Sequence, residues 1–222
     1  AFTLDDNYNQ SLAQLGFVVI NFAYRGSGPW RGRDFHTFGY GNLRDYALAD
    51  DMAAIRQIAA RYPCADIERV GIYGHSGGGF MTVAAMLNHP EFYKVGVAAS
   101  GNHDNNIYSQ WWGETFHGVK QTWGKDGKPH FECHIPTNIE LADRLAGRLL
   151  LITGDMDNNV HPASTARLAD ALIRARKRFD MTVIPGADHG LGNSYYVNLI
   201  RYYFTEHLLG LPQQEIDIVK HN

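Results

Sequence analysis

A short glycine-rich run constrains the fold of this chain more than any other part of it. The run reads GHSGG over residues 74–78 and lies between an apolar segment, residues 69–73, and a series of small and apolar residues, 77–87. These surroundings predict a strand, a sharp turn and a helix. Glycines let the helix pack close behind the strand, which lifts the hydroxyl of Ser76 above the edge of a sheet. The run therefore predicts an α/β sheet that carries a serine nucleophile on a turn.

The rest of the chain repeats the alternation of strand and helix. Strands are expected at the short apolar and β-branched segments, residues 15–24, 69–73, 94–99, 149–153 and 181–184. Helices are expected where apolar residues recur at helical spacing, in residues 43–62, 77–87, 138–145, 162–177 and 194–209. Residues 101–136 show no clear period, and so long a stretch is usually functional or contains short helices. The pattern is typical of an α/β fold with a mostly parallel sheet and helices on both faces.

Length and composition exclude several classes of protein. The 222 residues fit one domain, and 45% hydrophobic with 19% charged residues is ordinary for a soluble globular protein. The net charge of −3 gives no sign of a surface for nucleic acid or anionic membranes. No apolar run approaches the roughly 18 residues that span a bilayer. The chain begins at Ala1 without a leader-like segment, which favours a piece of a longer protein and leaves the compartment open, with periplasm and secretion both compatible.

A serine nucleophile needs a base, and the base needs an acid that orients it. On a sheet of this kind the acid and then the base follow the serine in chain order, each on a loop after a later strand. His189 follows the last expected strand, where the base belongs. Asp155 and Asp157 both follow the strand expected at residues 149–153, and spacing does not separate them. Gly77 begins the helix after the nucleophile, so its amide can stabilise an oxyanion.

Two other groups of reactive residues lead to weaker hypotheses. Residues 130–134 (HFECH) hold possible metal ligands but lack a second pair at a recognised spacing. A polar loop is the simpler interpretation, so we expect no metal, and acyl transfer to serine needs no other cofactor. Cys64 and Cys133 could be free thiols or one disulfide, and the sequence alone does not choose, although we prefer free thiols.

Several motifs together resemble the prolyl oligopeptidase family of serine peptidases, above all its dipeptidyl peptidase IV-like branch. The resemblance covers almost the whole chain and is carried by YRGSG at 24–28, GHSGGG at 74–79, DNNVH at 157–161 and DHG at 188–190. It implies an α/β-hydrolase fold and assigns the acid to Asp157 rather than Asp155. It also likens Asn159 to the residue that contacts the substrate carbonyl.

The resemblance further implies a pocket for the residue before the scissile bond. Tyr108 and Trp112 correspond to its aromatic positions, Trp111 lies close by, and Val160 would line the same pocket. A flat aromatic slot suits proline or alanine. In this family the first sheet strands, a β-propeller and a second oxyanion donor, a tyrosine hydroxyl, precede the part that this chain resembles. Residues 1–222 are therefore expected to be a peptidase catalytic domain that is truncated at its N-terminus.

The function that follows is hydrolysis of peptides by Ser76, Asp157 and His189. The resemblance implies a dipeptidyl or prolyl-type aminopeptidase that cleaves after Pro or Ala. One alternative is an acyl-peptide hydrolase or esterase with the same triad, and another is a catalytically inactive hydrolase-like module used for association. Related enzymes often dimerise through the final helix, so a homodimer through residues 194–209 is compatible with the sequence.

Overall fold

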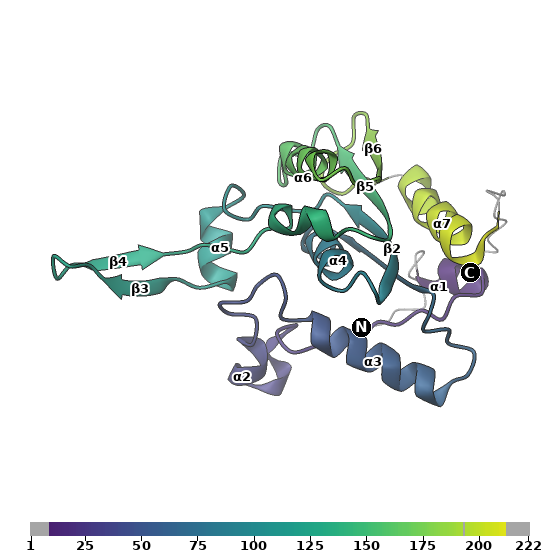
Figure 1. Ribbon diagram of the computed structural model, residues 1–222, viewed down its shortest axis with the longest axis horizontal. Coiled ribbons are helices and arrows are strands. Elements are labelled where there is room, and N and C mark those ends of the chain that lie inside the picture. Colours follow the sequence, from purple (N-terminus) through teal and green to yellow (C-terminus); the bar gives the residue numbers. More distant parts are fainter. Residues whose placement is uncertain (1–8, 193, 212–222) are drawn as a thin grey trace.

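The computed structural model describes residues 9–192 and 194–211, so both ends of the expected domain, 1–8 and 212–222, lie outside the described residues. Its main sheet has four parallel strands in the order β1-β2-β5-β6 (Figure 1). They are β1 (Val70–His75), β2 (Tyr93–Ala99), β5 (Arg148–Gly154) and β6 (Asp180–Ile184). The main helices are α3 (Leu48–Arg61), α4 (Gly77–Asn88), α6 (Ala163–Arg174) and α7 (Ser194–Leu209). The predicted α/β fold with a parallel sheet is confirmed.

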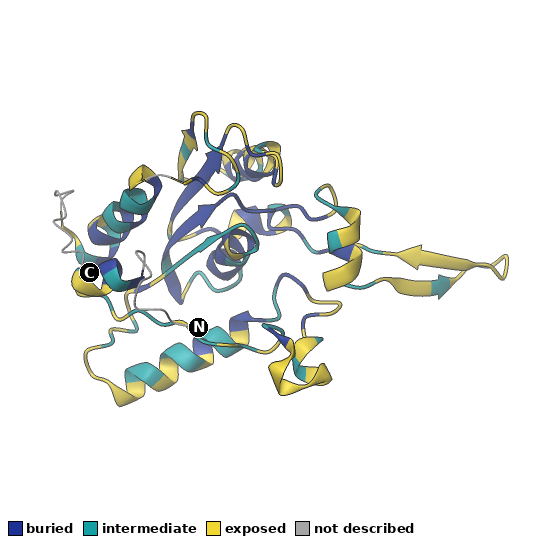
Figure 2. Ribbon diagram, turned by 180° about the vertical axis from the view of Figure 1, so that it is seen from behind, coloured by how far each residue is buried: buried dark blue, intermediate teal, exposed yellow. Residues whose placement is uncertain are grey.

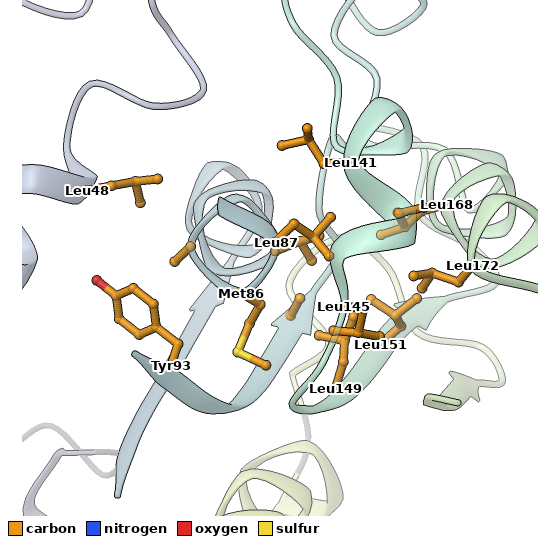
Figure 3. Packing of buried hydrophobic residues seen from close by; sticks show 14 of the residues in the cluster. Leu48, Met86, Leu87, Tyr93, Leu141, Leu145, Leu149, Leu151, Leu168 and Leu172 are labelled. Atoms are coloured by element: carbon orange, nitrogen blue, oxygen red, sulfur yellow. The ribbon is translucent and has the colours of Figure 1, made fainter. Parts of the chain in front are cut away.

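The core lies on both faces of this sheet because successive side chains of a strand point to opposite sides. Leu149 and Leu151 of β5 belong to a buried cluster with residues of α3, α4 and α6 (Figure 3). Leu150 and Ile152, the alternate residues, pack in a second cluster with α7. The run of six buried residues in β5 therefore contacts an apolar layer on each face of the sheet, as its continuous hydrophobicity predicts.

Residues 15–24, predicted as a buried strand, do not form one. They follow α1 (Asn9–Gln14) as an extended segment that pairs with no strand among the described residues, and their side chains are half-buried or exposed. A cavity of about 360 Å³ is lined by this segment, by β1 and by α3 and α7. In the structure the segment thus lies beside the cavity and not in the sheet. The apolar run is thus covered on one side instead of being enclosed in the sheet.

The aperiodic stretch at 101–136 holds one short helix and a hairpin that the sequence did not predict. Helix α5 (Gln110–Phe116) leads into β3 (Lys120–Trp123) and β4 (Pro129–Glu132), which pair only with each other in the described sheets. The hairpin projects from the body and is exposed over most of its length (Figures 1 and 2). Trp123 and Phe131 lie on the same face of it, and both are more than two-thirds exposed.

Most other expected elements are present with shifted ends. Residues 43–47 form turns before α3, and the helix expected at 138–145 is a 3₁₀ helix, η2 (Ile139–Arg144). The remaining short elements, η1 (Pro29–Arg31) and α2 (Arg33–His36), lie in the loop that follows the extended segment. Both cysteines are free, as preferred. None of the helices in the described part of the chain is long and apolar enough to cross a membrane.

The residues of the HFECH segment do not converge on one point. His130 lies 3.7 Å from the carboxylate of Asp126, whereas His134 lies 3.8 Å from that of Glu140. Across residues 9–192 and 194–211, no three residues of the types His, Cys, Asp and Glu gather as a metal site would require.

Gly74, near the end of β1, tolerates no side chain. A Cβ atom there would lie 2.4 Å from the main-chain carbon and oxygen of Gly78, and backbone in a helix cannot move aside. We expect Gly74→Ala to destabilise the fold by about 3 kcal/mol or more, and to lower the melting temperature by roughly 10 °C. Thermal unfolding followed by circular dichroism measures this.

The matched control is Gly78→Ala, because a Cβ at Gly78 meets no atom within 4 Å. In a helix this change should be neutral or stabilising by up to about 1 kcal/mol. Equal melting temperatures for the two variants would contradict the close approach of α4 to β1.

Candidate active site

Ser76 lies on a strained turn between β1 and α4. Its φ of 59° and ψ of −121° place a non-glycine residue in a sparsely populated region of backbone space. The turn is anchored by a hydrogen bond from the Ser76 amide to the carbonyl of Ala99 on β2, at 2.8 Å. Gly79, one turn further along α4, would bring a Cβ within 2.5 Å of that same oxygen. The close packing explains why small residues follow the serine.

The side chains of Ser76, His189 and Asp157 form one chain of hydrogen bonds. The Oγ of Ser76 lies 3.0 Å from Nε2 of His189, and Nδ1 of His189 lies 2.8 Å from Oδ2 of Asp157. A carboxylate accepts but does not donate, so the ring proton is on Nδ1. Nε2 then has a free lone pair toward the serine hydroxyl. This tautomer is the one that can take a proton from Ser76.

The three residues come from the carboxyl ends of three parallel strands. Ser76 follows β1, Asp157 follows β5 and His189 follows β6. In an open parallel sheet these ends lie at one edge, where α/β proteins place their ligands. The residues are far apart in the chain, and the register of the sheet brings them together.

Asp157 is fully buried and its second oxygen is also satisfied. Oδ1 accepts hydrogen bonds from the amides of Asn159 and Val160, at 3.0 and 2.9 Å, while Oδ2 faces His189. The side chain has no exposed surface, and that of His189 is about one-fifth exposed. These bonds stabilise the ionised carboxylate in a buried place.

Asp155, which spacing alone left as an equal candidate, has a different partner. Its Oδ1 accepts from the amide of Gly186 at 2.6 Å, in the loop that leads to His189. Asp155 is thus a turn carboxylate that ties two loops together, and Asp157 is the carboxylate in contact with the imidazole.

Gly77 is the first residue of α4, as expected for an oxyanion donor. The first amides of a helix have no acceptor within the helix, and the helix dipole is positive there. A Cβ at Gly77 would meet no atom within 4 Å, so the surroundings of this residue are not crowded on its Cβ side. The amide of Gly77 follows Ser76 directly in the chain, so an oxyanion formed at Ser76 would lie near it.

Three other histidines within the described residues have surroundings unlike those of His189. Burial lowers the pKa of His103 to about 3, so its ring is neutral, and its Nδ1 faces the amide of Asn138. The ring of His207 packs edge-on against Tyr203 within α7, and Nδ1 of His161 accepts from the amide of Ala163.

Aromatic side chains lie next to the hydrogen-bonded trio. The hydroxyl of Tyr108 donates to Oδ1 of Asn159 at 2.7 Å, and the Tyr108 ring meets Trp112 edge-on at 5.7 Å. Phe116, which the sequence did not single out for this role, extends the stack at 5.2 Å from Trp112. Burial raises the pKa of Tyr108, and the charge of Asp157 raises it further. The phenol therefore stays a neutral donor.

Trp111 and Val160, the other two residues of the predicted pocket, differ from each other in their exposure to solvent. Trp111 is 71% exposed and takes no part in the ring stack of Tyr108, Trp112 and Phe116, because adjacent residues of a helix point about 100° apart. Val160 is buried, with its amide on Asp157. The substrate-binding role of both stays a prediction.

A parallel sheet whose strand delivers a serine on a strained turn to the start of a helix is the α/β-hydrolase fold. The model of the prolyl oligopeptidase family, peptidase family S9, matches residues 3–211. The chain belongs to this family of serine peptidases.

Known relatives agree with this assignment. Human dipeptidyl peptidase 8 is 29% identical over 198 residues, which are 86% of this chain and 22% of the human protein. The Neurospora crassa protein named "Probable dipeptidyl-aminopeptidase B" is 30% identical over 87% of this chain and 20% of its own length. The crystal structure of Porphyromonas gingivalis dipeptidyl peptidase 4 matches with a TM-score of 0.68 at 27% identity, covering 80% of this chain and 25% of that one. The chain thus spans about a fifth of the length of these curated relatives.

Proposed function

We propose that this chain carries the catalytic centre of a serine peptidase that releases dipeptides from substrates with Pro or Ala before the scissile bond. The observation that carries the proposal is the hydrogen-bond chain from Ser76 through His189 to Asp157, with 3.0 and 2.8 Å between the bonded atoms. Nucleophile, base and acid stand in the order and contact that acyl transfer to serine requires.

The first half of the reaction forms an acyl-enzyme. Oγ of Ser76 attacks the scissile carbonyl carbon while Nε2 of His189 takes the hydroxyl proton. The imidazolium that forms is stabilised by Asp157. The carbonyl oxygen becomes an oxyanion, to which the amide of Gly77 donates together with the second donor that the family resemblance places upstream of Ala1. His189 then gives its proton to the leaving amine, and the peptide bond breaks.

The second half releases the product. A water molecule loses a proton to His189 and attacks the ester carbon of acylated Ser76. Collapse of the new tetrahedral intermediate breaks the ester bond and returns the proton from His189 to the serine oxygen. The cycle leaves Ser76, His189 and Asp157 in the state in which the structure holds them, and no metal or organic cofactor enters it.

Two observations support the substrate class. The relatives that match across most of this chain are named as dipeptidyl peptidases or dipeptidyl-aminopeptidases. Next to the trio, Tyr108 and Trp112 form an aromatic wall, and Asn159 lies between that wall and Asp157. A wall of this kind favours a compact apolar side chain such as proline or alanine over a long or charged one.

The test compares three kinds of substrate on the full-length protein. We expect Gly-Pro and Ala-Pro amides to be cleaved with kcat/KM at least tenfold above that of N-blocked peptides or short acyl esters, because the blocked amino terminus removes a charge that a dipeptidyl peptidase binds. Release of the amide's chromophore measures the rate.

The alternatives make opposite predictions in the same assay. Preference for N-blocked peptides would identify an acyl-peptide hydrolase, and preference for esters an esterase. A full-length protein that neither cleaves any substrate nor reacts with a fluorophosphonate would contradict the peptidase and favour a module for association.

A further inference from the structure

We infer that His75, the residue before the nucleophile, is a positioning residue. It joins the loop that carries His189 to the turn that carries Ser76. Nε2 of His75 lies 2.5 Å from the main-chain oxygen of His189, and the two imidazole rings stand with centroids 4.7 Å apart at 55°. The inference rests on the proposed function, since His189 is the residue that it positions.

The hydrogen bond determines which ring nitrogen of His75 acts as the donor. A main-chain carbonyl only accepts, so Nε2 of His75 must carry the proton and donate it. The half-buried ring of His75 also lies against the ring of His189. His75 thus acts as a fixed donor at the end of β1.

His75 and Ser76 together hold the same partner at two points. Ser76 contacts the side chain of His189 through Nε2, and His75 contacts its main chain through the carbonyl. Both donors belong to consecutive residues of one strained turn. The distance from the serine oxygen to the imidazole is therefore set by a short closed ring of contacts rather than by a single hydrogen bond.

The loop that carries His189 is also held by the loop that carries Asp155 and Asp157. The amide of Gly186 donates to Asp155, and the amide of Met156 donates to the carbonyl of Ala187 at 3.0 Å. These bonds place the loop relative to β5 and Asp157, but they do not reach β1. The bond from His75 supplies the tie on the nucleophile's side, and without it the base could shift along the line toward Ser76.

Loss of this tie should slow chemistry more than binding. A misplacement of about 1 Å between reacting groups can cost roughly 100-fold in rate. The aromatic wall that is proposed to bind substrate consists of Tyr108 and Trp112. The contacts of His75 described above are with His189 and not with this wall, so KM should change little.

The decisive experiment compares His75→Met with His75→Gln in the full-length protein. Both side chains are unbranched and of similar length, but only glutamine places an amide donor the same number of bonds from Cβ as Nε2 of histidine. We expect His75→Met to lower kcat and the fluorophosphonate labelling rate 10- to 100-fold with KM within twofold of wild type. His75→Gln should recover to within fivefold of wild type. His130→Phe on the exposed hairpin is the control and should change neither rate.

A spectroscopic readout separates positioning from general loss of structure. The proton on Nδ1 of His189, bonded to Asp157, should give a downfield NMR resonance. We expect it to broaden through exchange with water in His75→Met and to stay sharp in His75→Gln. If the methionine variant fails to fold, His75→Phe replaces it, since it keeps a ring without a donor. Equal rates and equal resonances for donor and non-donor variants would overturn the inference.

Failure of the proposed function would look different. A wild-type protein that cleaves no peptide but is labelled at Ser76 would contradict the peptidase, while the labelling rates and the resonance would still decide the role of His75. A peptidase that is active and indifferent to the Met and Gln changes would contradict the inference alone.

Discussion

Replacing Ser76 with alanine in the full-length protein is expected to lower kcat by roughly 10⁶-fold, the scale at which loss of a serine nucleophile acts. Without Oγ no acyl-enzyme can form, and a water molecule would have to attack the peptide directly. The variant keeps a Cβ at the positive φ of residue 76, so the strain of the turn is unchanged and the fold should persist. Steady-state hydrolysis of the best peptide amide, with the melting temperature as a check on folding, measures the effect.

The same variant should lose all labelling by a fluorophosphonate while still binding peptide. A loss of rate below tenfold would rule out Ser76 as the nucleophile. A loss of rate that is accompanied by a large drop in melting temperature would indicate unfolding instead. Both quantities are therefore measured on one preparation.

Asp157→Asn should lower kcat by about 10⁴-fold, and the reason lies in the proton on His189. The asparagine oxygen can keep the two main-chain bonds that Oδ1 of Asp157 now accepts, so the amide nitrogen will face Nδ1 of His189. That nitrogen donates, which forces the ring proton onto Nε2. A protonated Nε2 cannot take a proton from Ser76, so the base is present in the wrong tautomer.

Asp155→Asn is the matched control because it makes the same chemical change two residues away. Its oxygen can still accept from Gly186, so we expect less than a tenfold change in kcat. A larger effect at Asp155 than at Asp157 would contradict the assignment of the acid. The pH dependence of kcat, together with the downfield resonance of His189, distinguishes a changed tautomer from a displaced loop.

The sequence predicted the main sheet because its strands are short apolar and β-branched segments, of which β5, with six buried residues, is the clearest. It predicted Ser76 and His189 because strand ends and turn glycines are local signals. The choice between Asp155 and Asp157 was not local. Spacing left both open and the family resemblance chose Asp157. In the structure Asp157 is the one that is buried against His189, and its role as the acid stays a prediction.

The features that sequence reasoning missed depend on contacts between distant segments. Residues 15–24 have the composition of a buried strand, but in the structure they line a cavity beside β1 and pair with no strand among the described residues. The hairpin of β3 and β4 has one apolar and one polar face, yet neighbouring glycines and lysines obscure the alternation. The bond from His75 to the carbonyl of His189 spans 114 positions. The sequence motif shows only a histidine next to the serine and gives no sign of the partner of that histidine.

The order of the strands also has a consequence for the newly made chain. Among the described strands, Ser76 follows the first, β1, whereas His189 follows the last, β6, and the two meet only after β6 has docked on β5. Domains tend to fold from the N-terminus during synthesis. A chain that is still emerging from the ribosome thus holds its serine without a base to activate it. Under the proposed function, hydrolytic competence would be the last property acquired, so an immature chain could not cleave its neighbours.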